Sequence, residues 1–361
     1  MTGTSPAKVR FAVVGAGLIG PRHARTVAKH DDGELVAIVD PMPAGASLAA
    51  QLGTAHYNSV SELLQSPHKP DAAIICTPNH THVPVAKELS SGGIHLLIEK
   101  PFSTDIPSGM ELLDHLKRTG VRALVGHHRR FNSYIVAAKQ IVASGSLGRV
   151  VAINGLWVLQ KPAEYFEAPA AWRRRGSSGG VVLINLIHEV DLLQHLLGPI
   201  SSVHAEGMAR TRGFEAEEGA ALTLRFASGA VGTFLVADCL PSPHSFEAGT
   251  GENPLVPRTG QDFYRIFGTD ACLSVPDMAL WSYRDSAWKS WHESLTRETV
   301  PVPDEEAIPF DLQLDHFVRV VRGGEPPSCT PQAGLAALRV CLAIKEALDT
   351  NTTVQVEVSR L

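Results

Sequence analysis

Cysteine is scarce in this chain, and its few copies are scattered. The five cysteines show no CxxC spacing, and an odd number does not suit a framework of paired disulfides. A disulfide-stabilised small domain is therefore excluded. We expect buried thiols and a reducing, cytoplasmic location.

Long apolar runs and an excess of positive charge are also missing. No stretch reaches the roughly 18 consecutive apolar residues of a membrane span, so we expect no contact with a membrane. The formal net charge of −5 argues against nucleic acid as a partner. The 361 residues, of which 44% are hydrophobic, suffice for two domains with substantial cores.

The stretch Phe11–Gly20, with the sequence FAVVGAGLIG, is the most informative feature of the chain. Four apolar residues predict a buried parallel strand that runs directly into three glycines. Gly15 allows a tight turn, Gly17 lets a pyrophosphate approach the backbone, and Gly20 lets the next helix pack close to the strand. That helix would direct its free N–H groups at the phosphates. A glycine-rich turn can also simply join a strand to a helix, so the motif needs support from its context.

Asp40 supplies that support. A second apolar run, residues 34–39, ends at Asp40, twenty residues beyond Gly20. A carboxylate at this point can accept hydrogen bonds from both hydroxyls of the adenosine ribose. It would repel a 2′-phosphate, and no Arg or Lys lies between Asp40 and Gln51 to neutralise one. The sequence therefore favours NAD over NADP as the cofactor.

The first third of the chain alternates predicted strands and helices. Strands are expected at 72–76, 95–98 and 122–125, and helices at 44–52, 60–65, 82–91 and 106–118. Such alternation predicts a doubly wound parallel sheet, and ligands of that architecture lie beyond the carboxyl ends of the strands. We assign residues 1–126 to an α/β Rossmann domain that binds NAD.

Residues 127–361 have a different texture and form the predicted substrate-binding and oligomerisation domain. After a helix at 133–144, seven segments with strand character follow without intervening helices, which predicts a large, mainly antiparallel open sheet in an α+β domain. The polar stretch 241–260 is expected to be a mobile loop. Helices are expected near 310–320 and 331–348, with the C-terminal helix packing back toward the first domain.

One apolar segment, Gly179–Gly198, interrupts these strands. Apolar residues surround the predicted helix on nearly every side, so it should be buried. Asn185, His188, Asp191 and His195 follow one another at spacings of three, three and four, which places them along one helix face. Buried polar groups must be satisfied or line a cavity. A hydrogen-bonded core histidine and a catalytic cleft are both compatible with this stripe.

Several short motifs, in this order and spacing, resemble the Gfo/Idh/MocA oxidoreductases, named after glucose–fructose oxidoreductase and inositol dehydrogenase. They are GAGLIGPRH with His23, TPNHTH from Thr77, the EKP triplet at 99–101, GHHRRFN from Gly126, Trp172-Arg173, and IHEVD from Ile187. By this resemblance, the face of the second sheet forms homodimers or homotetramers, and the peptide before Pro101 is often cis.

The resemblance also implies roles for individual residues. His188 would be the base or proton shuttle, and Lys100 would stabilise the reacting oxygen. Cofactor contacts are expected at Gly15, Gly17, Leu18, Ile19, Gly20, Asp40, Thr77, Pro78, Asn79, His82, Glu99, Lys100 and Pro101. Substrate contacts are expected at Arg129, Asn154, Trp172, Arg173, Asn185 and Asp191, although solvated charge or core packing explains several of these equally well. We expect no metal site, because the histidines lack a recognisable ligand framework.

One position departs from the family pattern. Many of these dehydrogenases carry an Asp four residues before the catalytic His, and here that position is Ile184. An aliphatic side chain cannot orient an imidazole, so Asn185, Glu189 or Asp191 would have to replace it.

The expected function is hydride transfer between NAD and a secondary hydroxyl or ketone of a sugar, cyclitol or related hydroxylated ring acid. Two alternatives remain open. A redox-neutral glycosidase or lyase would recycle the NAD within one turnover, and a catalytically silent regulator would sense the dinucleotide.

Overall fold

The computed structural model describes residues 7–176 and 179–358. Two compact units make up the chain. Among the described residues, the first comprises 7–131 and 308–338, and the second comprises 132–176, 179–307 and 339–358. No helix in the described ranges combines the length and the apolar character needed to cross a membrane.

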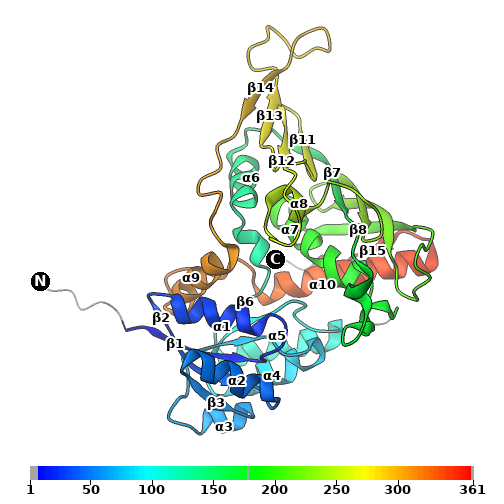
Figure 1. Ribbon diagram of the computed structural model, residues 1–361. Coiled ribbons are helices and arrows are strands. Elements are labelled where there is room, and N and C mark those ends of the chain that lie inside the picture. The colour runs from blue at the N-terminus through cyan, green and yellow to red at the C-terminus, as the bar shows by residue number, and fades with distance from the viewer. Residues whose placement is uncertain (1–6, 177–178, 359–361) are drawn as a thin grey trace, which may run out of the picture. The chain divides into compact units, whose positions relative to one another are not determined.

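The first unit is a six-stranded parallel sheet with the strand order β3-β2-β1-β4-β5-β6, flanked by helices (Figure 1). Its strands are β1 (Val9–Val14), β2 (Gly33–Val39), β3 (Ala55–Tyr57), β4 (Ala72–Ile75), β5 (His95–Ile98) and β6 (Ala123–Val125). Its first five helices are α1 (Gly20–Lys29), α2 (Pro43–Leu52), α3 (Val60–Leu64), α4 (His82–Ser91) and α5 (Ile106–Thr119). Strand β1 lies at the centre and pairs in parallel with β2 on one side and with β4 on the other. The predicted doubly wound sheet is confirmed, and the carboxyl ends of β1, β2, β4 and β5 share one edge.

A late helix completes the first unit. Helix α9 (Pro309–Val321) contacts α1, and Phe317 packs on Phe11 of β1 with ring centroids 6.0 Å apart. Helix α10 (Pro331–Thr350) follows, and the division between the units falls within it, after Leu338. The packing of Phe317 on Phe11 has no local signal in the sequence, because the two residues are some 300 positions apart.

The second unit is built on a nine-stranded sheet with the order β14-β13-β12-β11-β7-β10-β9-β8-β15. Its strands are β7 (Val150–Val158), β8 (Ile200–Gly207), β9 (Gly219–Phe226), β10 (Val231–Ala237), β11 (Tyr264–Gly268), β12 (Ala271–Val275), β13 (Ala279–Ser282), β14 (Thr296–Thr299) and β15 (Val354–Gln355). All paired neighbours are antiparallel except β7 and β10, which run parallel. The mainly antiparallel open sheet predicted from the sequence is therefore confirmed.

Helices α6 (Ser133–Ser144), α7 (Ile187–Leu197) and α8 (Phe246–Thr250) also belong to the second unit. Helix α8 corrects the expectation of a mobile loop at 241–260. Ser245 caps the helix by accepting a hydrogen bond from the Ala248 amide, and Phe246 is fully buried. The indole of Trp157 donates to Glu247 at 2.8 Å, which ties α8 to strand β7. The stretch is polar in composition, yet its few apolar residues anchor it.

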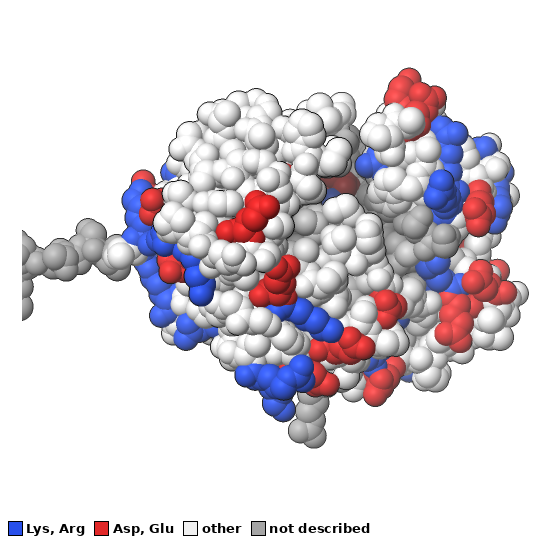
Figure 2. Space-filling view, turned by 90° about the horizontal axis from the view of Figure 1, so that it is seen from below, with Lys and Arg blue, Asp and Glu red and all other residues white. Residues whose placement is uncertain are grey.

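Figure 2 shows acidic and basic side chains intermingled on one face of the molecule, without a broad area of a single sign. The absence of a basic area on this face agrees with the formal net charge of −5.

Candidate functional site

In the turn between β1 and α1, Gly15 and Gly20 must be glycine for different physical reasons. Gly15 has φ +98°, and a Cβ there would lie 2.7 Å from the carbonyl carbon and oxygen of Cys76. A Cβ at Gly20 would lie 1.9 Å from the carbonyl oxygen of Gly15. A side chain at either position would therefore force the turn apart.

Gly17 differs because its surroundings are open. A Cβ at Gly17 would meet no atom of the protein within 4 Å. The next residue, Leu18, is 90% exposed, and α1 begins at Gly20 with no acidic residue in its first turn. Space beside a glycine backbone, next to uncapped N–H groups at a helix start, suits a pyrophosphate. The residues present therefore fit the phosphates of a dinucleotide.

Asp40 follows β2 at the same edge of the sheet. Its Oδ2 accepts from the amide of Ala16 in the glycine turn at 2.6 Å, and its Oδ1 accepts from the amide of Met42 at 2.8 Å. These bonds fix the carboxylate against the glycine turn. Each oxygen retains a second lone pair, so the group can still accept hydrogen bonds from ribose hydroxyls.

The turn after β4 contains Thr77, Pro78 and Asn79. The hydroxyl of Thr77 is buried and has no hydrogen-bond partner among the described residues. Such an atom is costly unless a ligand or a water molecule satisfies it. Its place at the carboxyl end of a strand beside the glycine turn is the place at which this fold binds dinucleotides.

His82, at the start of α4, has a supporting role in this turn. The histidine is 1% exposed, and its Nδ1 and Nε2 lie 2.8 Å from the carbonyl oxygen of Pro101 and 2.9 Å from that of Thr77. Burial lowers the pKa of His82, although both carbonyls act in the opposite direction. The ring thus links the turn after β4 to the turn after β5, so His82 serves the expected cofactor site by holding its backbone.

The EKP triplet follows β5. Glu99 is 6% exposed, and its carboxylate bonds the Nε2 of His23 at 2.8 Å and the amide of Lys100 at 3.2 Å. Although burial alone raises it, the hydrogen bond and positive charge of His23 hold the pKa of Glu99 at about 2. The Lys100–Pro101 peptide is cis, as the resemblance predicted. Glu99 therefore fixes the backbone position of Lys100.

This ion pair predicts an acid-dependent stability. A carboxylate whose pKa is depressed from 4.5 to about 2 stabilises the folded state fully above pH 4.5 and loses that contribution as the pH falls toward 2. Glu99→Gln should lower the free energy of unfolding by on the order of 3 kcal/mol near neutral pH. Urea denaturation of both proteins from pH 2 to 7 checks this, and a constant difference across that range would contradict it.

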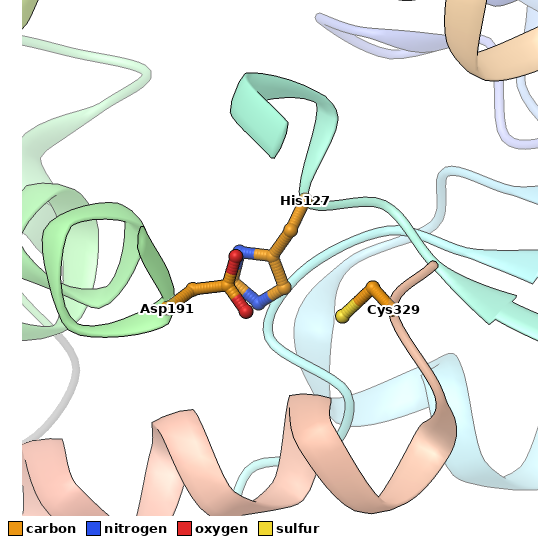
Figure 3. A group of neighbouring side chains, drawn as sticks. All are labelled: His127, Asp191 and Cys329. Atoms are coloured by element: carbon orange, nitrogen blue, oxygen red, sulfur yellow. The ribbon is translucent and has the colours of Figure 1, made fainter. Parts of the chain in front are cut away.

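His127 and Cys329 are a further pair of buried side chains in the first unit. His127 follows β6, and the amide of Val125 donates to the carbonyl of Cys329 at 2.9 Å. Figure 3 draws these two residues together with Asp191, which belongs to α7 of the second unit. Within either unit taken alone, the described residues hold no group of three potential metal ligands. The expectation of no metal site remains a prediction.

The buried helix of the second unit begins differently from the prediction. Residues Val182–Leu186 form a π-helical turn, η5, and the regular helix α7 begins only at Ile187. His188 and Asp191 lie in α7 and are buried, whereas Asn185 lies in η5 and is half-exposed. The assumed helical spacing therefore does not extend to Asn185. π-Helical turns occur frequently at functional sites.

The structure gives a partner to Asn185 and to Glu189, two of the candidates that could replace the missing Asp. Lys161 donates to the Oδ1 of Asn185 at 2.6 Å. The hydroxyl of Tyr264 donates to the carboxylate of Glu189, which is fully buried. Ile184 itself is half-exposed.

The other predicted substrate residues lie in several places. Arg173 donates to the carbonyl of Tyr165 at 2.8 Å and stacks on its ring at 3.8 Å, and the neighbouring Trp172 is 39% exposed. Asn154 lies on the opposite face of β7 from buried Trp157 and donates to Thr233 at 3.1 Å. Arg129 is buried within the first unit. Because Asn154 lies on the face of β7 opposite to Trp157, it does not belong to the candidate site.

Sequence reasoning missed Lys161 and Asp238, whose side chains lie 3.1 Å apart and almost fully buried. A signal was present. Each residue follows the apolar run of a predicted strand by a few positions. A charged side chain there is typical of a loop, and it gains meaning only when the two strands are known to be neighbours. That pairing was not predicted.

Two family models together match almost the whole chain. The model described as an oxidoreductase family with an NAD-binding Rossmann fold matches residues 9–127, and the C-terminal α/β domain of the same family matches residues 139–356.

Individual proteins are similar over all or part of the chain. The scyllo-inositol 2-dehydrogenase (NAD⁺) of Bacillus subtilis is 27% identical over 372 residues, which cover 98% of both chains. The crystal structure of the WlbA dehydrogenase from Bordetella pertussis, in complex with NADH and UDP-GlcNAcA, has a TM-score of 0.79 and 25% identity, with 99% of this chain and all of that chain covered. A 2,7-anhydro-N-acetylneuraminate hydratase of Escherichia coli is 26% identical over 192 residues, about half of each chain.

Proposed function

Because the chain belongs to the Gfo/Idh/MocA family of oxidoreductases, we propose that it transfers a hydride between NAD and a secondary hydroxyl or ketone of a cyclitol, sugar or hydroxylated ring acid. The observation that carries this proposal is the open space at Gly17 beside the start of α1, with Asp40 fixed against the same turn. The full-length similarity to an NAD⁺-dependent scyllo-inositol dehydrogenase supports the substrate class.

The first unit would bind and orient the cofactor. The glycine turn and the start of α1 would hold the pyrophosphate, Asp40 the adenosine ribose, and the orphaned hydroxyl of Thr77 would donate to a further oxygen of the dinucleotide. When bound, NAD accepts a hydride at its nicotinamide ring. Asp40 would repel the additional phosphate of NADP, so we expect NAD to bind more tightly.

Lys100 and His188 would handle the substrate oxygen and its proton. An alcohol that loses hydride must also lose its hydroxyl proton, and an imidazole has a pKa suited to accepting one near neutral pH. The ammonium group of Lys100 would donate to the developing alkoxide. Glu99 has no such role, because its carboxylate already bonds His23 and the amide of Lys100.

Purified protein should accumulate NADH when it is incubated with NAD and at least one member of a panel of cyclitols, aldoses and uronic acids. Absorbance of the reduced nicotinamide measures this directly, and the same panel with NADP tests the expected preference. If NADH binds tightly but no compound yields net reduction, a catalytically silent sensor becomes the better account.

The partial similarity to a hydratase favours a second candidate. In a redox-neutral reaction, a transient oxidation would acidify a neighbouring C–H bond, and elimination or addition of water would follow before the hydride returned. Conversion of the substrate without net NADH formation would identify this chemistry.

We further propose that the protein is a homo-oligomer through the exposed face of its second sheet. A shallow depression of about 480 Å³ lies on this face, lined by residues of β7 to β10 that include Asn154, His204 and Thr233.

A further inference from the structure

Lys161 is a buried lysine of the second unit that none of the roles above uses. Its side chain is 7% exposed. Its ammonium group lies 3.1 Å from Oδ2 of Asp238, 2.6 Å from Oδ1 of Asn185 and 4.4 Å from the ring centre of Tyr165. Burying an ammonium group is costly, so a lysine in such a position needs a reason.

The sheet topology explains how Lys161 and Asp238 meet. Strands β7 and β10 are parallel neighbours that end together, with Val158 opposite Ala237. The residues just beyond them therefore leave the sheet side by side, and the amide of Lys161 donates to the carbonyl of Asp238 at 3.0 Å. The other carboxylate oxygen of Asp238 pairs with the guanidinium of Arg212. One anion thus lies between two cations.

The burial of Lys161 shifts the pKa of its ammonium group. Burial lowers the pKa of Lys161 to about 8, although Asp238 and Glu247 act in the opposite direction. Arg173 also lowers it. The ammonium form persists at neutral pH, and its hydrogen bond to Asn185 is therefore a charge-assisted one.

The hydrogen bond to Lys161 determines which way the Asn185 amide faces. A lysine ammonium group has three donors and no acceptor, so the amide oxygen of Asn185 must point at it. The NH2 group of Asn185 then points away from Lys161. Since Asn185 is half-exposed and stands three residues before His188, those two N–H donors are available to a molecule bound beside α7.

We propose that Lys161 is a positioning residue that holds the Asn185 amide as an obligate hydrogen-bond donor to an oxygen of the substrate. This inference rests on the proposed function and sharpens it. The Asn185 subsite accepts a substrate group with a free lone pair, such as a ring hydroxyl, a ketone or a carboxylate oxygen, and rejects an ammonium group at that position. The Lys161–Asn185 pair thereby contributes specificity where the family Asp is replaced by Ile184.

Two variants of nearly unchanged shape test the pair. Asn185→Asp keeps an oxygen for Lys161 but replaces the outward NH2 group with a carboxylate oxygen. Lys161→Met keeps an unbranched side chain that is one atom shorter and removes the donor. Asn58→Asp makes the same chemical change at an exposed residue of the first unit and serves as the control.

The measurement is calorimetric titration of scyllo-inositol and of D-glucuronate into full-length protein saturated with NADH, which cannot oxidise the secondary hydroxyls of either compound. We expect the dissociation constant of the probe that binds to rise about 30-fold in Asn185→Asp and at least about 10-fold in Lys161→Met. The dissociation constant of the double variant should be no higher than that of the more strongly affected single variant. The affinity for NADH and the melting temperature of Asn185→Asp should stay near those of the wild type.

An unchanged dissociation constant in Asn185→Asp would overturn the inference, as would failure of both probes to bind the wild-type protein. Failure of the proposed function has a different signature. In that case the wild-type protein would bind a probe but form no NADH from it when NAD is supplied.

Discussion

Replacing Lys100 with alanine should reduce kcat by at least about 10³-fold while it leaves the affinity for NADH nearly unchanged. The reason is that Lys100 would donate to the reacting oxygen, where negative charge grows most in the transition state. The backbone conformation at Lys100 does not depend on the lysine side chain. The carboxylate of Glu99 accepts from the backbone amide of Lys100, and the ring of His82 bonds the carbonyl of Pro101. The variant should therefore fold normally.

Steady-state kinetics with the substrate found in the NADH assay measure the effect, and fluorescence of bound NADH measures the cofactor affinity. Lys117→Ala, an exposed lysine on α5, is the matched control and should behave as the wild type. A loss of less than tenfold in Lys100→Ala would show that this lysine does not stabilise the reacting oxygen.

Alanine at Gly17 and alanine at Gly20 should have opposite kinds of effect. Gly17→Ala adds a methyl group where no protein atom lies within 4 Å, so the free energy of unfolding should change little. The methyl group would occupy the space that a pyrophosphate needs, and the affinity for NAD should fall by about 100-fold. Gly20→Ala instead places a Cβ 1.9 Å from the carbonyl oxygen of Gly15 and should cost about 3 kcal/mol or more of folding stability.

Thermal unfolding without ligand and fluorescence titration with NADH separate the two effects. The account requires that Gly17→Ala melts near the wild-type temperature and binds weakly. If Gly17→Ala bound NADH with wild-type affinity, the phosphates could not lie against this turn.

The Rossmann half of the chain was largely predictable because its signals are local. Each strand from β1 to β6 is a short apolar run, except β3, which was missed because its three residues, Ala55–Tyr57, are only half-buried. Gly15 and Asp40 follow β1 and β2 directly, so strand order alone brought them to one edge.

The second half was less predictable because its decisive contacts are distant in sequence. Strand β14 has the charged sequence TRET and carries no apolar run, so nothing marked it. Lys161 and Asp238 meet only because β7 pairs in parallel with β10, some 80 residues away. The π-helical turn at η5 likewise has no local signature, and it displaced Asn185 from the helix stripe that the spacing predicted.

The central claim is that hydride passes from a secondary carbon of the substrate to NAD. The most direct test uses the cyclitol or sugar identified as a substrate, deuterated at its C–H positions. Both products are then analysed by mass spectrometry. We expect one deuterium in each NADH formed, in amounts equal to the ketone produced. Product formed without NADH, or NADH without deuterium, would contradict net hydride transfer from the substrate.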